Sequence, residues 1–580
     1  MNFRLLIILA LVATGMLQVP TSHAQTFTVN STSDVDDRNN NNAQLTFREA
    51  IRRANETNGR ATINFNASLG NSPVITVTGG PYEITDDVDI DARIFSTDLT
   101  LNAGDNSRIL TINNGRNAVD VVRIYNVDFN RGEAIGDGDS GFGGAIFNEE
   151  NLLLTDCSIR NSFASGLGGG VYNLGVFRTL RTTFEDNEAQ NGGGVCNAED
   201  ARCDISRSTF TANEATFDGG GLFNLGEAEL DRNTFEGNEA GGGGGLTNEA
   251  SGEMECDRDE FIMNTAGFGG AIDNSGVLEL DQVEVRLNES TQTGGGISNF
   301  GGGELTITRS ELRDNVSIGF GGGIANETGS TLTVATTEFR DNIGSTGGGV
   351  DNLGVVTIDE SVFRGNEAFN GGAILNFEGQ MTIQDSTITR NSGGQGGGIQ
   401  TFADLDVERC TIDRNTSEDF GGGVSVDAGG ELRMRNCTLS QNTAETYGGG
   451  VDNIGDVDLG SCTFTLNRSG AGGDAFFAFQ GAFSIDNSIV NSNVQGAFNG
   501  AFNLFATSIA EVDVNGNNNI FSTAPSLGSL RNNGGPTQTH LPNANSPAIN
   551  RGGGLDGQNV DQRGLPRVNG GLVDIGSVER

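Results

Sequence analysis

The 580-residue sequence contains no lysine and no tryptophan. Its strongly basic side chains are therefore all arginines, and 76 Asp and Glu against 34 Lys and Arg give a formal net charge of −42. An acidic excess of this size repels nucleic acids and anionic lipid, so we expect no nucleic-acid partner. The charge suits a soluble extracellular protein, a cation-binding protein or a protein from a salty habitat.

Hydrophobic residues are also scarce, at 35% of the chain. This fraction is low for one spherical core, and such cores stop growing at about 250–300 residues. A solenoid avoids the limit because each repeat packs only against its neighbours. The composition therefore favours a repeat protein over a single globule.

The residues that commonly build catalytic centres are few. After residue 24 the sequence has one histidine, His540, which we interpret as structural because a catalytic triad would have to be assembled around it. No C-x-x-C pair is present, which disfavours a zinc site. The seven cysteines are too sparse for a disulfide framework, although Cys196 and Cys203 are close enough in sequence to pair across a loop. We predict no catalytic residue.

The first 24 residues are typical of a secretory signal peptide. Arg4 supplies the positive start, the apolar stretch runs from Leu5 to Leu17, and Ser22-His23-Ala24 resembles a cleavage site. The apolar stretch is too short to favour a membrane span, and no later segment is long and apolar enough to form one. We expect a mature chain that begins at Gln25, is secreted or displayed on the cell surface, and has no integral membrane segment.

A glycine-rich tag followed by an apolar residue, one further residue and Asn recurs every 24 to 27 residues. The Asn of this tag is Asn148, Asn173, Asn197, Asn224, Asn248, Asn274, Asn299, Asn326, Asn352 and Asn376; Thr401 and Val426 interrupt the series, and Asn453 resumes it. A second series comprises Asn161, Asn187, Asn213, Asn238, Asn264, Asn288, Asn315, Asn342, Asn366, Asn391, Asn415, Asn442 and Asn467. An apolar residue, often Phe, stands three residues before most members of the second series.

This repeat predicts an all-β fold, a single-stranded right-handed parallel β-helix with about 25 residues per coil and an N-terminal helical cap. Helical repeats are excluded because three glycines would cost each helix about 3 kcal/mol, and the leucine-rich pattern L-x-x-L-x-L is missing. Alternating segments such as Glu304–Thr308 indicate strands. We expect three short strands and three turns per coil, in about 17 coils stacked ~4.8 Å apart.

Stacking gives the repeated residues their roles. Asn side chains that lie above one another can form a hydrogen-bonded ladder, and the Phe, Leu and Ile positions form an apolar column. The predicted ladder residues are Asn187, Asn213, Asn238 and Asn264 in the second series and Asn173, Asn197 and Asn224 in the tag series. Cys410, Cys437 and Cys462 each precede a ladder Asn by five residues, so we expect them to stack as a column of thiols.

The segment from Leu45 to Asn55 is predicted to be a helix that covers the first coil. Thr46 and Glu49 form a capping-box pattern. The apolar residues that share one face of this helix are Phe47, Ala50, Ile51 and Ala54.

The helix segment resembles the CSLREA region near the start of many secreted bacterial β-helix proteins. Thr46, Arg48, Glu49 and Ala50 match that region, whereas Leu45 and Phe47 replace its Cys and Leu. The C-terminal part resembles the choice-of-anchor Q domain, and the matching segments are Gly534–His540, Ser546–Asn550, Asp561–Gly564 and Asp574–Gly576. The repeats are similar to those of chlamydial polymorphic outer-membrane proteins, with GGAI at Gly143–Ile146 and FxxN at Phe184–Asn187. These resemblances imply a bacterial surface protein.

The predicted organisation has four parts: a signal peptide at 1–24, an N-terminal cap at 25–60, the β-helix at 61–505 with its clearest repeats at 143–480, and a choice-of-anchor-Q-like domain at 506–580. Glu188, Glu214 and Glu239 each follow a ladder Asn in three consecutive coils. Because stacked carboxylates repel unless a cation bridges them, these three residues are a hypothetical calcium site. No other cofactor is predicted.

Two functions are compatible with the sequence. The first is a non-catalytic, adhesin-like protein that presents an extended face to an extracellular polysaccharide or a surface protein. The alternative is an extracellular polysaccharide lyase or glycoside hydrolase of the β-helix type. Asp273, Asp351 and Asp452 occupy equivalent tag positions, but the nearest two are about 14 Å apart at ~4.8 Å per coil, which is too far for a catalytic carboxylate pair.

Overall fold

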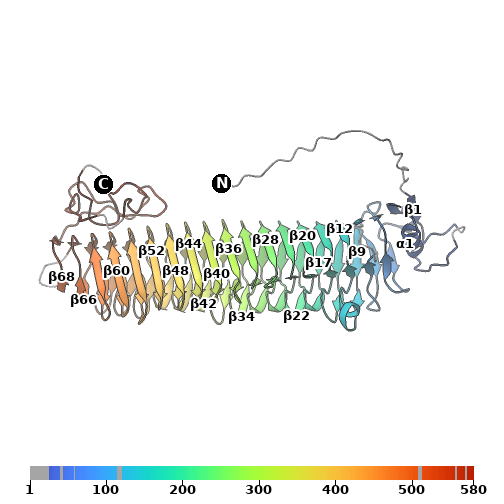
Figure 1. Ribbon diagram of the computed structural model, residues 1–580, viewed down its shortest axis with the longest axis horizontal. Coiled ribbons are helices and arrows are strands. Elements are labelled where there is room, and N and C mark those ends of the chain that lie inside the picture. The colour runs from blue at the N-terminus through green and yellow to red at the C-terminus, as the bar shows by residue number, and fades with distance from the viewer. Residues whose placement is uncertain are drawn as a thin grey trace, which may run out of the picture.

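The computed structural model of the protein describes residues 25–39, 43–57, 59–113, 121–506, 513–554, 558–568 and 571–580. The predicted signal peptide lies outside the described residues. The chain forms a long rod of short parallel strands, with α1 (Phe47–Asn55) at one end and an irregular C-terminal segment against the side of the other end (Figure 1). The predicted parallel β-helix is confirmed. No helix in the described ranges has the length and apolarity needed to cross a bilayer.

Each regular coil contains four strands rather than the three expected from the sequence. One coil consists of β15 (Val171–Asn173), β16 (Val176–Leu180), β17 (Thr183–Glu185) and β18 (Glu188–Asn191). Each strand pairs in parallel with its counterpart in the next coil, and we name the four resulting stacks sheets C, A, B and D in that order. The strand that the prediction missed belongs to the 14-stranded sheet D, whose register shifts at several points.

Sheet C is the stack that begins just after each glycine tag. Its strands are β4 (Tyr82–Ile84), β7 (Leu110–Ile112), β11 (Ile146–Asn148), β15, β19 (Val195–Asn197), β23 (Leu222–Asn224), β27 (Leu246–Asn248), β31 (Ile272–Asn274), β35 (Ile297–Asn299), β39 (Ile324–Asn326), β43 (Val350–Asn352), β47 (Ile374–Asn376), β51 (Ile399–Thr401), β55 (Val424–Val426), β59 (Val451–Asn453), β63 (Phe476–Ala478) and the first half of β66 (Val494–Asn499).

The glycine tag makes the tight turn from sheet D into sheet C. Gly192 has φ +67°, a left-handed conformation that glycine adopts without strain. A Cβ on Gly193 or Gly194 would lie 2.5 Å from a carbonyl oxygen of the next coil, so the close stacking at this corner requires glycine.

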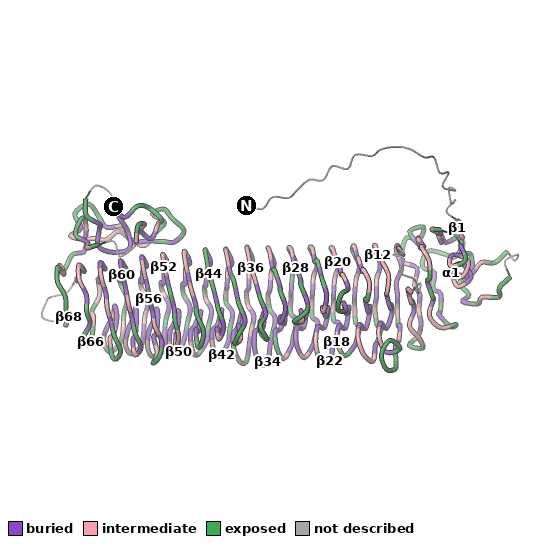
Figure 2. Tube along the Cα trace, in the orientation of Figure 1, coloured by how far each residue is buried: buried purple, intermediate pink, exposed green. Residues whose placement is uncertain are grey.

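The interior is a stack of apolar side chains, and buried residues recur in the successive coils of the rod (Figure 2). Phe184, Phe210, Phe235 and Phe261 lie above one another with ring centroids 4.4 to 4.9 Å apart and planes within 9° of parallel. All four rings are fully buried. The predicted apolar column is therefore an ordered stack of rings, which gains both burial and aromatic contact.

The predicted asparagine ladders are both present. In the second series, the Asn213 amide nitrogen donates to Asn238 Oδ1 at 3.0 Å and to the Phe184 carbonyl at 2.9 Å, and the same pattern links Asn187 to Asn467. In the tag series, amide-to-amide bonds of 2.7 to 2.9 Å connect Asn148 to Asn376.

The first member of the second series was wrongly predicted. Asn161 is exposed with φ +51°, and Ser162 occupies the ladder position, where its backbone N–H donates to Asn187 Oδ1. The spacing of the repeat is unchanged, because Ile159 pairs with Phe184 and Ser162 follows it by three residues, so the ladder residue of this coil is a serine and Asn161 lies one position before it.

All seven cysteines are buried and unpaired. The expected thiol column exists, because the Cys410 backbone N–H donates to Cys437 Sγ at 3.4 Å. The pairing of Cys196 with Cys203 that their sequence separation allows does not form: Cys203 belongs to the rod interior, whereas Cys196 belongs to a separate apolar cluster outside sheet C. Burial raises the pKa of both thiols, which keeps them protonated.

The N-terminal helix α1 has the predicted capping box: Thr46 accepts from the Glu49 N–H, and the Glu49 carboxylate accepts from the Thr46 N–H. Arg48, one of the CSLREA-like residues, forms an ion pair of 3.0 Å with the buried Asp34, which also accepts from the Tyr82 hydroxyl at 2.7 Å. β1 (Gln25–Val29) precedes the helix and pairs with β2 (Ala61–Phe65), so the N-terminal segment contributes a strand to sheet A as well as the helix.

The C-terminal segment docks on the outer surface of sheet B. Its effect is visible in β53 (Thr411–Asp413), β57 (Thr438–Ser440) and β61 (Thr463–Thr465), where all three residues are buried, whereas the outer residues of β17 are partly exposed. His540 is buried in this interface and hydrogen-bonds Ser440 through Nε2 at 3.0 Å, in accordance with its structural interpretation.

The residues of the choice-of-anchor-Q-like motifs form this contact. Gln562 donates to the Cys410 carbonyl at 3.0 Å and accepts from the Thr438 hydroxyl at 2.6 Å. Asp561 is fully buried and pairs with Arg563 at 2.7 Å. The motif is thus a docking element for the last coils.

We predict that Gln562→Ala weakens this docking. The substitution leaves buried polar groups without partners, which costs at least about 1–3 kcal/mol. Limited proteolysis should cleave residues 522–580 faster, because cleavage follows the population of the open form. Gln538→Ala is the matched control, since the Gln538 side chain is exposed and only its carbonyl contacts the rod. Equal cleavage rates for both variants would contradict the assignment.

A second prediction concerns Asp259, which occupies a buried polar ladder at the turn from sheet A to sheet B. Its Oδ1 accepts from the backbone and side chain of Asn233 at 2.6 and 2.9 Å, and its Oδ2 has no partner. Burial raises the pKa of this carboxyl to about 8. Its stabilising contribution is therefore complete below the unfolded-state pKa and is lost as pH rises through about 8.

Asp259→Asn should accordingly raise the free energy of unfolding by about 1–3 kcal/mol at pH 9 and leave it nearly unchanged at about pH 3, below the unfolded-state pKa of about 3.9, because the amide needs no proton to donate. Chemical denaturation at both pH values measures this, with the exposed Asp404→Asn as control. A variant that is no more stable than the unmodified protein at pH 9 would refute the buried-charge explanation.

Candidate functional site

The outer surface of sheet C is built from three columns of side chains. The first is the middle residue of each strand, which points away from the core because its two neighbours point inward; it includes Thr247, Asp273, Ser298, Ala325 and Asp351. The second runs along the ends of the sheet D strands and includes Asp218, Gly242, Phe268, Thr293, Phe320, which joins it through isolated bridges, and Thr346. The third is the residue after each tag Asn and includes Glu249, Ser275, Phe300, Glu327 and Leu353. We call these columns the sheet C face.

The central column lies below the other two. Its residues point outward, yet Thr247, Asp273, Ser298 and Asp351 are at most 5% exposed. The flanking columns therefore shield the central column from solvent.

One pocket of about 710 Å³ on this face combines residues of all three columns. Its lining residues are Asp218, Glu249, Phe268, Asp273, Thr293, Ser298, Phe300, Gly301, Glu327 and Thr328. Four of these are carboxylates, and we call the site the acidic pocket.

Asp218 and Asp273 approach each other in the acidic pocket because Gly242 separates them without a side chain. A Cβ on Gly242 would lie 2.7 Å from Asp218 Oδ1 and 2.8 Å from Asp273 Oδ2. The two oxygens are therefore separated by no more than the sum of these distances. Asp273 Oδ1 is buried and has no hydrogen-bond partner, so this carboxyl retains capacity to bind a donor.

Burial and neighbouring charge raise the pKa of both carboxyls. The pKa of Asp273 rises to about 7, mainly through burial and further through Asp218, Glu249 and Glu327, and a hydrogen bond from Ser298 offsets only part of the shift. The pKa of Asp218 rises to about 6 through burial and the charge of Glu249. The pKa values of both carboxyls therefore lie close to neutral pH.

None of the four carboxylates forms an ion pair with an arginine in the described part of the chain, and no cation lowers the pKa of Asp218 or Asp273. Sheet B differs: there Arg313 lies 2.5 Å from Glu284 and 3.4 Å from Glu311. The acidic pocket thus carries negative charge that the protein does not neutralise.

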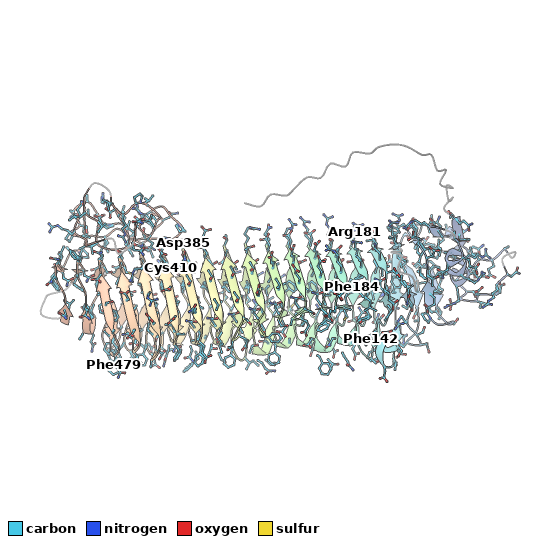
Figure 3. The ribbon with its side chains drawn as sticks, viewed as in Figure 1. Phe142, Arg181, Phe184, Asp385, Cys410 and Phe479 are labelled. Carbon is cyan, nitrogen blue, oxygen red and sulfur yellow. The ribbon has the colours of Figure 1, made fainter. Side chains whose placement is uncertain are left out.

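The edges of the sheet C face carry exposed phenylalanine rings. Among the described residues, five of the seven exposed phenylalanines lie in the flanking columns, namely Phe268 and Phe320 in the second and Phe300, Phe377 and Phe479 in the third, whereas Phe217 and Phe369 lie one residue before the second column. Figure 3 shows Phe479 on the opposite edge of the rod from Arg181 and Asp385. Aromatic surface is therefore concentrated on one face.

The central column contains two further buried carboxyls towards the C-terminus. Asp351 accepts from the Thr346 hydroxyl, and burial raises its pKa to about 6. Burial and the nearby Asp427 raise the pKa of Asp452 to about 7. The predicted alignment of Asp273, Asp351 and Asp452 in one column is present, with steps of three and four coils between them.

The sequence reasoning missed Asp218, because it compared only residues at the same position of the repeat. Asp218 comes from sheet D two coils before Asp273, and only the turn at each glycine tag brings the two columns together. One sequence signal could have indicated this contact. Gly242 interrupts a column in which the residues before and after it, Asp218 and Phe268, carry side chains, and the missing side chain leaves room for Asp218 and Asp273 to approach each other.

The predicted calcium residues Glu188, Glu214 and Glu239 are stacked in register on sheet D and are exposed. Within the described ranges, no group of three or more His, Cys, Asp or Glu side chains converges in a way that could hold a metal ion. The calcium hypothesis therefore stays a prediction.

A family model described as the right handed beta helix region matches residues 295–469, in accordance with the fold. No match to a curated protein was found. Among solved structures, the periplasmic alginate epimerase AlgG is similar at 11% identity with a TM-score of 0.26, over 80% of this chain and 83% of that chain. The pectate lyase Pel9A is similar at 13% identity with a TM-score of 0.15, over 97% of this chain and 98% of that chain.

Proposed function

We propose that the protein is a secreted or cell-surface bacterial protein that binds an extended polysaccharide along the sheet C face without cleaving it. The concentration of exposed phenylalanine rings on the two edges of this face is the observation that carries the proposal. Rings at these positions can stack against the apolar faces of sugars, and their burial by a ligand is favourable.

The floor between the rings suits a ligand rich in hydroxyl groups. Ser298 and Thr293 supply hydroxyl groups in the acidic pocket, and Asp351 supplies a carboxyl two coils beyond Ser298 in the same column. The backbone of sheet C is paired with the coils above and below, so it offers no free edge to a peptide strand. Side chains therefore provide the recognition, which favours a polysaccharide over an extended peptide.

Secretion and surface display are supported by the signal-like first 24 residues and by the CSLREA-like and choice-of-anchor-Q-like motifs. The docking role of the latter motif in the last coils gives it a structural function, and surface attachment is tested separately by fractionating cells that express the full chain.

The double substitution Phe268→Ala, Phe300→Ala tests the binding proposal. A panel of soluble neutral, acidic and amino polysaccharides is first assayed by affinity electrophoresis, and the variant should bind the retained polysaccharide roughly tenfold more weakly, since each aromatic contact contributes about 0.5–1.5 kcal/mol. Val355→Ala is the control, because Val355 is an exposed apolar residue on sheet A. Retention of no polysaccharide, or unchanged binding by the double variant, would overturn the proposal.

The close approach of Asp218 and Asp273 favours a glycoside hydrolase as the second candidate. Such enzymes use one carboxylic acid to protonate the leaving oxygen and one carboxylate as base or nucleophile, and burial raises the pKa of both Asp218 and Asp273, as a general acid requires. Incubation of the same panel followed by reducing-end analysis distinguishes the candidates. If the protein generates new reducing ends and the Asp273→Asn variant does not, hydrolysis replaces binding as the function.

A further inference from the structure

We infer that the acidic pocket binds the ammonium group of an amino sugar, so that the polysaccharide on the sheet C face is one with free amino groups. This inference rests on the proposed polysaccharide-binding function and adds the chemical class of the ligand.

The charge of the acidic pocket favours a cation. Asp218, Glu249, Asp273 and Glu327 line one pocket, and no arginine neutralises them among the described residues. Buried carboxyls without a counter-charge are costly, and the cost is removed when a cation binds between them. Because the sequence has no lysine at all, a ligand is the natural source of an ammonium group.

The arrangement of the carboxylate oxygens favours an ammonium group. Asp218 Oδ1 and Asp273 Oδ2 face the same space beside Gly242, and Asp273 Oδ1 is buried without a partner. An ammonium group has three N–H donors, so it can donate to both carboxylates at once in charge-assisted hydrogen bonds. A metal ion fits this site less well, because the described residues contain no group of three or more ligating side chains that could hold one.

The aromatic walls of the pocket favour a cation that is carried by a sugar. Phe268 and Phe300 are 41% and 36% exposed and stand on opposite edges of the pocket. A cation near an aromatic face is attracted to it, and the same rings can cover the apolar face of the sugar that carries the cation. An inorganic cation would use the carboxylates and leave both rings exposed to water.

The same column repeats the buried acid further along the rod. Asp351 lies three coils beyond Asp273, and Asp452 lies four coils beyond Asp351, which at ~4.8 Å per coil are steps of about 14 and 19 Å. A polymer that carries amino groups at intervals can engage several of these carboxyls at once, and linked contacts strengthen one another through effective concentration.

The test compares a glucosamine hexamer with its fully N-acetylated counterpart by isothermal titration calorimetry on the full chain. The glucosamine hexamer should bind at least tenfold more tightly. Asp273→Asn and Asp218→Asn should each weaken its binding at least tenfold, whereas Asp404→Asn, an exposed carboxyl on sheet A, should leave it unchanged.

Gly242→Ala separates the pocket from the overall acidity of the rod. It keeps every carboxylate, but its Cβ displaces the Asp218 and Asp273 oxygens. Weakened binding of the glucosamine hexamer by this variant supports the site, and unchanged binding overturns it because general charge attraction would then suffice.

The remaining outcomes separate this inference from the proposed function. If both hexamers bind equally and the Phe268→Ala, Phe300→Ala variant loses this binding, the ammonium site is overturned and the proposed polysaccharide-binding function of the sheet C face is retained. Tighter binding of a lysine hexapeptide than of the glucosamine hexamer overturns the sugar as the carrier. Failure of both hexamers and of every polysaccharide in the panel overturns the binding function itself.

Discussion

The whole structure depends on vertical repetition, since a side chain at one position of a coil lies against the side chain at the same position of the next coil. Inside the rod, this constraint selects residues that can satisfy copies of themselves. An Asn amide is both donor and acceptor, so Asn213 accepts from Asn187 while it donates to Asn238. Phe rings stack in the same way, as Phe184 and Phe210 do. Because each interior side chain must contact a copy of itself, the same residue types recur at the same position of successive coils and keep the coils in register.

On the outside, the same repetition brings like charges together. On sheets A and B, arginines on adjacent coils relieve this repulsion, as Arg202 does between Asp204 and Glu229. The sheet C face has acids without such partners, and burial holds the protons on Asp273 and Asp452 to nearly neutral pH. The face that holds the acidic pocket is therefore also the face whose described carboxyls lack arginine partners.

The features that the sequence could predict are those that repeat. The ladders, the Phe column, the aligned Asp273, Asp351 and Asp452, and the capping box of Thr46 and Glu49 all follow from a fixed period or a local motif. The sheet D strand was missed because glycines and register shifts weaken its alternation. The partnership of Asp218 with Asp273 and the docking of Gln562 on Cys410 were missed because they join different columns or distant segments, and no period records such contacts.

A solenoid can be extended coil by coil, because each new coil needs only the one before it. The C-terminal segment breaks this independence: Gln562 reaches the carbonyl of Cys410, 152 residues earlier in the chain. That contact can form only after synthesis has passed the final coils and turned back along them. The C-terminal segment therefore covers the outer residues of these sheet B strands only once the residues around Gln562 have folded back against them.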